Sequence, residues 1–320
     1  MSRRNLSPTE LFDAACAGDR AALARVLSLL ERGDVVAREV GRMAYKRGGN
    51  GYTVGITGAP GAGKSTLTSA VIKHLRSMQL EIAVLAIDPS SPFTGGAILG
   101  DRVRMQDHAT DPGVFIRSMA TRGHLGGLSL STPEAIRMLD AVGRQWILVE
   151  TVGVGQVEVE IAGKADTTVV VLNPGWGDSV QANKAGLMEI ADIFVINKAD
   201  RKGVEETRRD IEQMLELSDL AHDAWRPPII ATVGNTGEGV TQLWDAIVEH
   251  RSIIETSGEL QKRRDFRLRE ELREIVARRL ELRAREICTG DQWETLQNGV
   301  LDRSIDPWSA ADEMLKGVGA

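Results

Sequence analysis

The sequence predicts an α/β protein whose central sheet is mostly parallel, is flanked by helices, and carries helical extensions at both ends. Three observations support this fold class. Short apolar runs alternate with longer segments of helical periodicity between residues 51 and 255, which is the pattern of parallel strands joined by crossover helices. A glycine-rich loop follows the first of these runs, and residues 259–287 are highly charged and free of glycine and proline, which predicts one long helix.

Residues 1–47 are expected to form an N-terminal helical extension. Ser7, Pro8 and Glu10 stand where a helix places its capping serine, its first-turn proline and its third-position glutamate. Gly18-Asp19 should end this helix and cap a second one. In the second helix four apolar residues fall on one face at helical spacing, namely Leu23, Val26, Leu27 and Leu30.

Residues 48–255 are expected to form the main α/β domain. A polar, glycine-rich junction at residues 46–51 precedes it. Seven short apolar runs follow, each bounded by turn residues or by a stretch with helical periodicity. These predicted strands are residues 53–57, 82–87, 114–116, 146–150, 168–172, 193–196 and 229–232.

Residues 256–320 are expected to form a C-terminal helical extension that opens with the long charged helix. Apolar residues recur at every fourth position in it, at Leu268, Leu272, Val276 and Leu280. Such a stripe on a charged helix needs an apolar partner surface. The helix either packs on its own domain or serves as a dimerisation arm, and the sequence alone leaves both open.

The composition argues against several classes of function. The chain has 320 residues, 42% of them hydrophobic, and a formal net charge of −6, so no excess of positive charge would attract nucleic acid. An apolar stretch of about 20 residues, as a membrane-spanning helix requires, does not occur in the sequence. Cys16 and Cys288 are far apart, which argues against a disulfide framework. We therefore expect a cytoplasmic protein that binds neither nucleic acid nor membrane.

The glycine-rich loop has the sequence GAPGAGKS at residues 58–65, which matches G-x-x-x-x-G-K-[ST] between a predicted strand and a predicted helix. In such a P-loop, backbone N–H groups at a helix N-terminus face the β-phosphate. Lys64 would neutralise the β and γ oxygens, and the Ser65 hydroxyl would ligate Mg²⁺. The fold is thus expected to be that of a P-loop NTPase. Nucleotide contacts are expected from Gly58, Gly61, Ala62, Gly63, Lys64, Ser65 and Thr66.

The sequence NKAD at residues 197–200 follows an apolar strand and predicts guanine recognition. The Asp200 carboxylate can accept from guanine N1–H and from the exocyclic amine together, whereas adenine would leave that charge poorly paired. Lys198 would lie along the base, and Asn197 would tie this loop to the P-loop. A final base loop is expected at Val233, Gly234 and Asn235, directly after the last predicted strand.

The strand at residues 146–150 ends in ETVG, which resembles the D-x-x-G motif of nucleotide switches. Glu150 would reach Mg²⁺ through a water molecule, and the Gly153 N–H would sense the γ-phosphate. Val154 stands where small GTPases commonly place a glutamine that positions water. Slow intrinsic hydrolysis is therefore expected, with a switch residue or a partner protein completing the site.

Residues 86–105, AIDPSSPFTGGAILGDRVRM, hold two further candidates. Asp88 ends an apolar strand beside the expected phosphates. Asp101 lies in a glycine-rich loop that could fold over the nucleotide. Both carboxylates are candidates for contacts with Mg²⁺ or with the attacking water.

Taken together, GAPGAGKST, residues 86–105, ILVETVGVGQ and NKAD resemble the MeaB/ArgK/MMAA family of P-loop GTPases. The resemblance covers residues from about Leu11 to His250. It implies magnesium-dependent hydrolysis of GTP to GDP, a homodimer, and slow turnover that is accelerated by adenosylcobalamin-dependent methylmalonyl-CoA mutase. Members act as chaperones that gate cobalamin loading of this mutase and protect it from inactivation. An adenosyltransferase is a further candidate partner.

The resemblance also assigns residues. Lys64 and Ser65 match the family's P-loop, while Asp88, Asp101 and Glu150 match its magnesium and switch carboxylates. Lys184, in the segment GWGDSVQANK, matches a lysine of an additional switch loop. Asn197, Lys198 and Asp200 match the base-reading loop.

Two other functions remain open from the sequence. Some relatives are described as kinases or ATPases linked to amino-acid transport, and such an enzyme would need an acceptor pocket with its own base. Nickel-delivery GTPases form the second alternative. They usually carry Cys and His ligands near the nucleotide, whereas the histidines here are scattered, at His74, His108, His124, His222 and His250.

Overall fold

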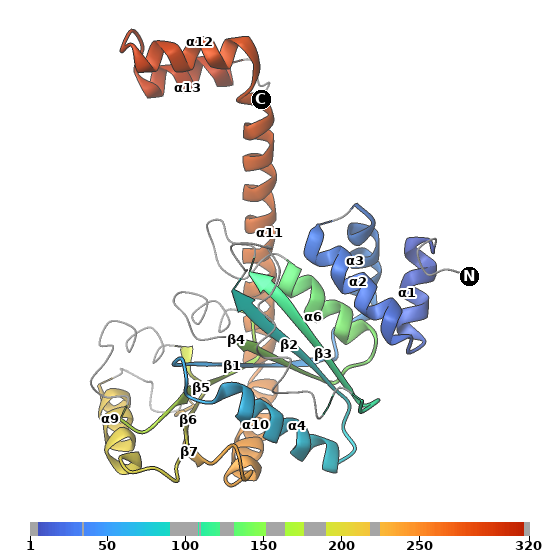
Figure 1. The fold of residues 1–320 in the computed structure, drawn as a ribbon, viewed down its shortest axis with the longest axis vertical. Helices are drawn as coiled ribbons and strands as arrows, with labels where there is room; N and C mark the ends of the chain where they lie inside the picture. Colours follow the sequence, from blue (N-terminus) through green and yellow to red (C-terminus); the bar gives the residue numbers. More distant parts are fainter. Residues whose placement is uncertain are drawn as a thin grey trace. The chain divides into compact units, whose positions relative to one another are not determined.

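The structure is a computed structural model that describes residues 6–33, 35–89, 108, 110–121, 131–151, 164–175, 190–217 and 225–316. Within these ranges one 7-stranded sheet has the order β3-β2-β4-β1-β5-β6-β7 (Figure 1). Every pairing of neighbouring strands is parallel. The predicted fold class is confirmed, and each predicted apolar run lies in a strand. The strands are β1 (Tyr52–Gly58), β2 (Ile82–Pro89), β3 (Val114–Thr121), β4 (Trp146–Thr151), β5 (Thr167–Leu172), β6 (Ile193–Asn197) and β7 (Ile229–Thr232).

Strand β3 is longer than the predicted strand at residues 114–116: it continues past Ile116 to Thr121. Arg117 gives the second half of this strand a polar pattern. Its guanidinium donates to Glu31 Oε2 at 2.9 Å and to Ser28 Oγ at 3.0 Å, and both partners belong to helix α2 (Arg20–Arg32). This ion pair satisfies a charge that would otherwise oppose burial of the strand.

Helices α4 (Lys64–Ser77) and α10 (Val240–Thr256) cover one face of the sheet. Their apolar side chains pack with alternate residues of β1, β2, β4, β5 and β6. The rings of Trp146 and Trp244 meet edge to face with centroids 4.4 Å apart. The Arg251 guanidinium lies 5.0 Å from the centroid of the Trp146 ring. This packing holds α4, the helix that begins at the glycine-rich loop, against the centre of the sheet.

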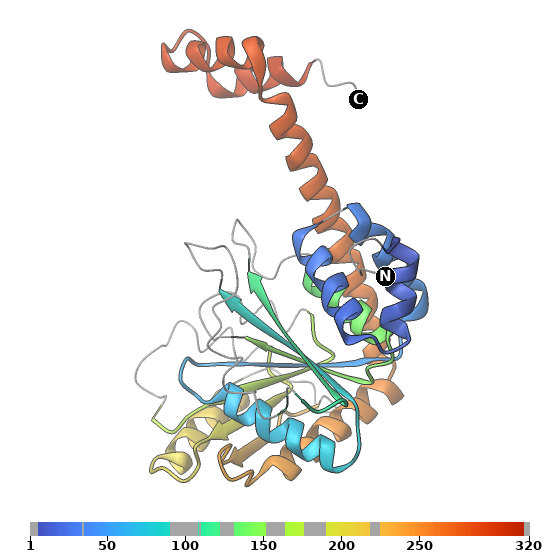
Figure 2. The ribbon, with the colours of Figure 1, turned by 45° about the vertical axis from the view of Figure 1, so that its right-hand side comes forward.

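The opposite face carries the other helices that the structure describes before β7. Helices α1 (Pro8–Cys16), α2, α3 (Val35–Arg47) and α6 (Ser131–Ala141) share one apolar cluster with β2, β3 and β4 (Figure 2). Helix α9 (Val204–Glu216) packs on β5 and β6 in a second cluster. The N-terminal helices therefore contribute directly to the core that supports the central strands.

The N-terminal caps are those that the sequence predicted. Ser7 and Glu10 form a capping box, and Asp19 accepts from the backbone N–H groups of Ala21 and Ala22. Helix α3 was not predicted as a separate element. Its buried face consists of small apolar residues in a charged segment, Ala37, Val40 and Ala44, so it lacks the large apolar residues that mark a buried helix face in the sequence.

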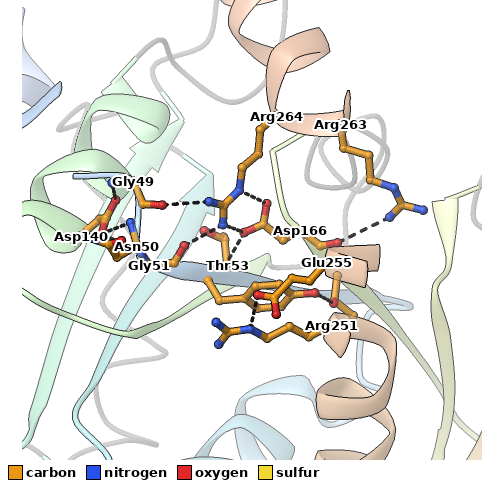
Figure 3. A network of polar contacts seen from close by, with 12 residues as sticks. Gly49, Asn50, Gly51, Thr53, Asp140, Asp166, Arg251, Glu255, Arg263 and Arg264 are labelled. Carbon is orange, nitrogen blue, oxygen red and sulfur yellow. Dashed lines mark hydrogen bonds and ion pairs between the residues drawn. The ribbon is translucent and has the colours of Figure 1, made fainter. Parts of the chain in front are cut away.

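A polar network fixes the start of β1 (Figure 3). The Asp140 carboxylate accepts from the backbone N–H groups of Gly49, Asn50 and Gly51. Arg264 donates to the carbonyl oxygens of Gly49 and Gly51 at 3.1 and 2.7 Å. It also donates hydrogen bonds to both carboxylate oxygens of Asp166. The Asp166 carboxylate in turn accepts from the Thr53 N–H at 3.0 Å. We call these residues (Gly49–Gly51, Thr53, Asp140, Asp166 and Arg264) the amino-edge junction, because they lie at the amino end of β1.

A second buried polar chain lies beside this junction. The Tyr52 hydroxyl is 2.6 Å from Thr167 Oγ1, which is 2.8 Å from Nδ1 of the fully buried His250. Nε2 of His250 lies 3.2 Å from Asp192, and Arg263 donates to the same carboxylate at 3.0 Å. Burial opposes ionisation of Asp192, but the His250 hydrogen bond and the Arg263 charge lower the pKa of its carboxyl below the usual value. His250 is thus a packed, hydrogen-bonded residue of the core.

The chain consists of two compact units, Met1–Arg264 and Asp265–Ala320. Helix α11 (Glu259–Ile287) spans the boundary between them. In the second unit α12 (Gly290–Leu301) and α13 (Pro307–Leu315) pack against each other. Among the described apolar side chains of this unit, only those of Ala310 and Met314 are buried. The described helices include no segment that is long and apolar enough to span a membrane.

Candidate nucleotide-binding site

The glycine-rich loop connects the carboxyl end of β1 to the first turn of α4. Two of its glycines are required by the backbone. Gly58 has φ +130°, and a Cβ at this position would lie 2.0 Å from the Val171 carbonyl oxygen. Gly63 has φ +91°, and a Cβ there would lie 2.5 Å from Asn197 Nδ2. The loop therefore delivers the chain to an α4 N-terminus whose first N–H groups lack intrahelical acceptors, as in an anion site.

Lys64 is the cation of this loop and is 6% exposed. Its ammonium group donates to the carbonyl oxygens of Gly58 at 2.7 Å and Ala59 at 3.0 Å. Both acceptors are main-chain groups of the loop itself. The charge is therefore held inside the curve of the loop, where a phosphate bound to the N–H groups would meet it.

Ser65 and Glu150 are brought together from different parts of the fold. Glu150 ends the ladder between β4 and β1, where it is the register partner of Ile56. Its carboxylate is 2% exposed, and the Ser65 hydroxyl donates to Oε1 at 2.6 Å. A hydroxyl and a carboxylate at the mouth of a P-loop are the oxygen ligands that Mg²⁺ prefers. These two side chains fit that ion and could hold it directly or through water.

The base loop is tied to the P-loop by Asn197. Its Nδ2 donates to the carbonyl oxygens of Ala62 at 2.8 Å and Gly63 at 3.3 Å. Its Oδ1 accepts from Thr232 Oγ1 at 3.1 Å and from the Gly234 N–H at 3.0 Å. One buried amide thus joins the phosphate loop, the NKAD segment and the loop after β7. Lys198 adds a further link, because its ammonium donates to the Gly61 carbonyl at 2.5 Å.

These loops enclose one cavity beside the N-terminus of α4. Eight of the predicted site residues line it: Gly63, Thr66, Asn197, Lys198, Asp200, Val233, Gly234 and Asn235. Arg201 also lines it and was not predicted. Its position directly after NKAD was the available signal, because a residue next to a base-reading aspartate lies beside the same pocket.

Four predicted residues are not part of this description of the site. Asp101, Gly153 and Lys184 lie outside the described residues. Asp88 lies near the end of β2 in register with Ala120 of β3. Among the described residues, no group of three His, Cys, Asp or Glu side chains has a metal-binding arrangement.

The comparison with protein families matches residues 23–289 to the family described as methylmalonyl-CoA mutase-associated GTPase MeaB. A protein of Pyrococcus abyssi, named as a GTPase, is 52% identical over 311 residues, which cover 97% of this chain and 96% of the relative. The mouse (Mus musculus) mitochondrial methylmalonic aciduria type A homolog is 34% identical, over 96% of this chain and 78% of the relative.

Among solved structures, the crystal structure described as the LAO/AO transport system kinase superposes with a TM-score of 0.73 and 25% sequence identity. The match covers 99% of both chains. The likeness therefore extends over the described fold and supports the α/β architecture read from the sequence. With the family match over most of the chain and the GTPase relatives, it shows that this protein belongs to the MeaB family and is a P-loop GTPase that hydrolyses GTP.

Proposed function

We propose that this GTPase is a chaperone of an adenosylcobalamin-dependent methylmalonyl-CoA mutase, that it gates cobalamin loading of the mutase and that it protects the mutase from inactivation. The observation that carries the proposal is the match of residues 23–289 to the mutase-associated family. The mouse relative named for methylmalonic aciduria supports the same client. A cytoplasmic location fits this role, and an adenosyltransferase is a second candidate partner.

The proposed site acts mainly by positioning and by electrostatics. On binding GTP, the Lys64 ammonium exchanges its carbonyl partners at Gly58 and Ala59 for oxygens of the β and γ phosphates. Ser65 and Glu150 would hold Mg²⁺, and Asp88 and Asp101 would supply further carboxylates. Bound Mg²⁺ supplies positive charge beside the phosphate oxygens.

The switch in this proposal consists of three loops outside the P-loop. The Gly153 N–H senses the γ-phosphate, and the segments around Asp101 and Lys184 adopt one arrangement with GTP and another with GDP. The mutase binds the two arrangements with different affinity, because only a difference in affinity lets hydrolysis change the complex. The absence of glutamine after Gly153 supports slow intrinsic hydrolysis, which leaves room for stimulation by the client.

Replacing Asp200 with asparagine should relax guanine selectivity. Guanine would lose the carboxylate that accepts from both N1–H and the exocyclic amine. We therefore expect GTP affinity to fall by about 10- to 100-fold. Xanthosine triphosphate should gain affinity, because the asparagine amide can donate to the carbonyl oxygen that replaces the amine. Competition titrations with a fluorescent nucleotide measure both changes.

The matched control for this test is Asp245→Asn, because Asp245 is an exposed aspartate of α10 away from the cavity. It should keep the wild-type affinities. Unchanged preference of Asp200→Asn for GTP over ATP would refute the base assignment.

We also propose that the C-terminal extension forms a homodimer contact. Leu272 and Leu280 of α11 are 61% and 65% exposed, and the unit Asp265–Ala320 has little core of its own. A unit of this size is stable when such a stripe is covered by another apolar surface. A second copy offers the same stripe, and sedimentation equilibrium of the purified protein tests the proposal. A monomer at assay concentration would contradict it.

The client is tested by measuring GTP hydrolysis by the purified protein alone and with the methylmalonyl-CoA mutase of the same organism. We expect slow hydrolysis that rises at least about tenfold with mutase, which corresponds to about 1.4 kcal/mol of transition-state stabilisation. ATP is the control nucleotide and should be turned over poorly in both cases. A GTPase rate indifferent to the mutase would refute the client assignment, and transfer of phosphate to a transport protein would favour a kinase instead.

A further inference from the structure

Within the described residues, the last side-chain link between β1 and β4 is a pair of buried threonines. These two strands supply the magnesium candidates. The backbone ladder between these strands ends at Ile56 and Glu150. One residue further on, Thr151 Oγ1 donates to Thr57 Oγ1 at 3.1 Å. The two side chains are 1% and 0% exposed. A hydrogen bond between hydroxyls thus takes over at the position where the described backbone pairing stops.

The two threonines flank the groups that carry the site. Thr57 precedes Gly58, whose carbonyl oxygen accepts from the Lys64 ammonium. Thr151 follows Glu150, whose carboxylate accepts from Ser65. On its other side β4 pairs with β2 as far as Ile87 and Thr151. On its other side β1 pairs with β5 as far as Gly58 and Val171. Between β1 and β4 themselves, the threonine hydrogen bond is the link that the structure describes beyond Ile56 and Glu150.

The threonine pair acts through the backbone and not by touching the nucleotide. Successive side chains of a strand point to opposite faces of the sheet. Ile56 belongs to the cluster on the α4 and α10 face, so Thr57 points to the other face. Thr151 is likewise the neighbour of Glu150, which points toward Ser65 at the start of α4. The two hydroxyls therefore lie on the sheet face opposite α4, away from Ser65.

We propose that Thr57 and Thr151 are positioning residues for the magnesium site, holding the carboxyl end of β4 at a fixed distance from the P-loop so that Ser65 and Glu150 can serve one ion. This inference rests on the proposed magnesium site. Mg²⁺ requires a nearly ideal octahedron with short ligand distances, so a small displacement of one strand weakens its binding. Loss of one hydroxyl also leaves the other buried without its partner.

Thr151→Val tests the proposal, because valine keeps the shape of threonine and removes the hydroxyl. The readout is the Mg²⁺ concentration that half-maximally slows release of a non-hydrolysable fluorescent GTP analogue. We expect that concentration to rise about fivefold in Thr151→Val and in Thr57→Val. The double variant should show no larger shift than either single variant, because both substitutions remove the same bond.

Thr68→Val is the matched control. Thr68 is a fully buried threonine of α4, and its hydroxyl has no hydrogen-bond partner among the residues that the structure describes. Its replacement should leave the Mg²⁺ response unchanged. An equal shift in Thr68→Val would show a general effect of hydroxyl loss and would overturn the proposal.

Two further outcomes distinguish the magnesium site from the positioning role of the threonines. A wild-type protein whose nucleotide release ignores Mg²⁺ would refute the proposed magnesium site itself. A normal wild-type response that Thr151→Val retains would refute the positioning role alone. If the valine variant does not fold, Thr151→Ser and Thr151→Ala make the comparison. The serine variant should keep the wild-type Mg²⁺ response, and the alanine variant should show the shifted response. Equal responses of the two variants would overturn the inference.

Discussion

Replacing Lys64 with alanine abolishes productive nucleotide binding, with the affinity for GTP and GDP expected to fall by at least about 100-fold. The ammonium group is 6% exposed and already lies between two carbonyl oxygens of the P-loop. We expect it to exchange these acceptors for phosphate oxygens when a nucleotide binds. Charge-assisted hydrogen bonds to anions are worth about 1.5–3 kcal/mol each, and the variant loses two of them. Isothermal titration with GDP and GTP measures the loss.

Lys73→Ala is the control for this experiment. Lys73 is an exposed lysine of the same helix, α4, so its removal changes the net charge equally without touching the loop. We expect wild-type affinity and hydrolysis for it. Normal turnover by Lys64→Ala would refute the placement of the phosphates and, with it, the proposed roles of Ser65 and Glu150.

The parts of the site that the sequence predicted are those encoded by short patterns at strand ends. Lys64, Ser65 and Asn197 each occur in such a pattern, and parallel strands bring their carboxyl ends to one edge of a sheet. Glu150 could be placed beside Ser65 by the same argument, although 85 residues separate them. Arg201 could have been inferred from its position directly after NKAD. The Thr57–Thr151 hydrogen bond could not be predicted, because it belongs to no sequence pattern and depends on how the two strands lie at their carboxyl ends.

The sheet was predictable for a related reason. Buried parallel strands read as short apolar runs, and the fully buried β1, β4, β5 and β6 are of this kind. The end of β3 was not predictable, since Arg117 is neutralised by Glu31 from a helix more than 80 residues away in the chain. Helix α3 was missed because small residues such as Ala37 and Ala44 make up part of its buried face. Predictions from local sequence patterns fail where a distant partner changes the free energy of burying a residue.

The amino-edge junction is the clearest case of such a distant partner. Arg264 belongs to a segment rich in arginine, and nothing in its immediate sequence distinguishes it from Arg267 or Arg269. In the fold it reaches Asp166, 98 residues earlier, and the Gly51 carbonyl, 213 residues earlier. Burial opposes its charge, but the hydrogen bonds and charge of Asp166 raise the pKa of the guanidinium above its usual value. The start of the P-loop strand is therefore held by a residue from the other end of the unit.

Replacing Arg264 with methionine should destabilise the protein by about 3 kcal/mol, because breaking a buried ion pair leaves the other charge without its partner. The Asp166 side chain is 2% exposed. In the variant its carboxylate would keep the hydrogen bond from the Thr53 N–H but would lose the neighbouring positive charge. The Gly49 and Gly51 carbonyls would lose their donor as well. For a domain of this size the melting temperature should fall by about 6 °C. Urea and thermal unfolding, followed by circular dichroism, measure both quantities.

Two variants identify the cause of this loss. Arg269→Met replaces an exposed arginine of the same helix and should change stability by no more than about 0.5 kcal/mol. Asp166→Asn combined with Arg264→Met removes both charges, and it should be more stable than Arg264→Met alone because no buried charge is left unpaired. A double variant no more stable than Arg264→Met would contradict the coupling, and an Arg264→Met protein as stable as wild type would show that the amino-edge junction does not hold β1 in place.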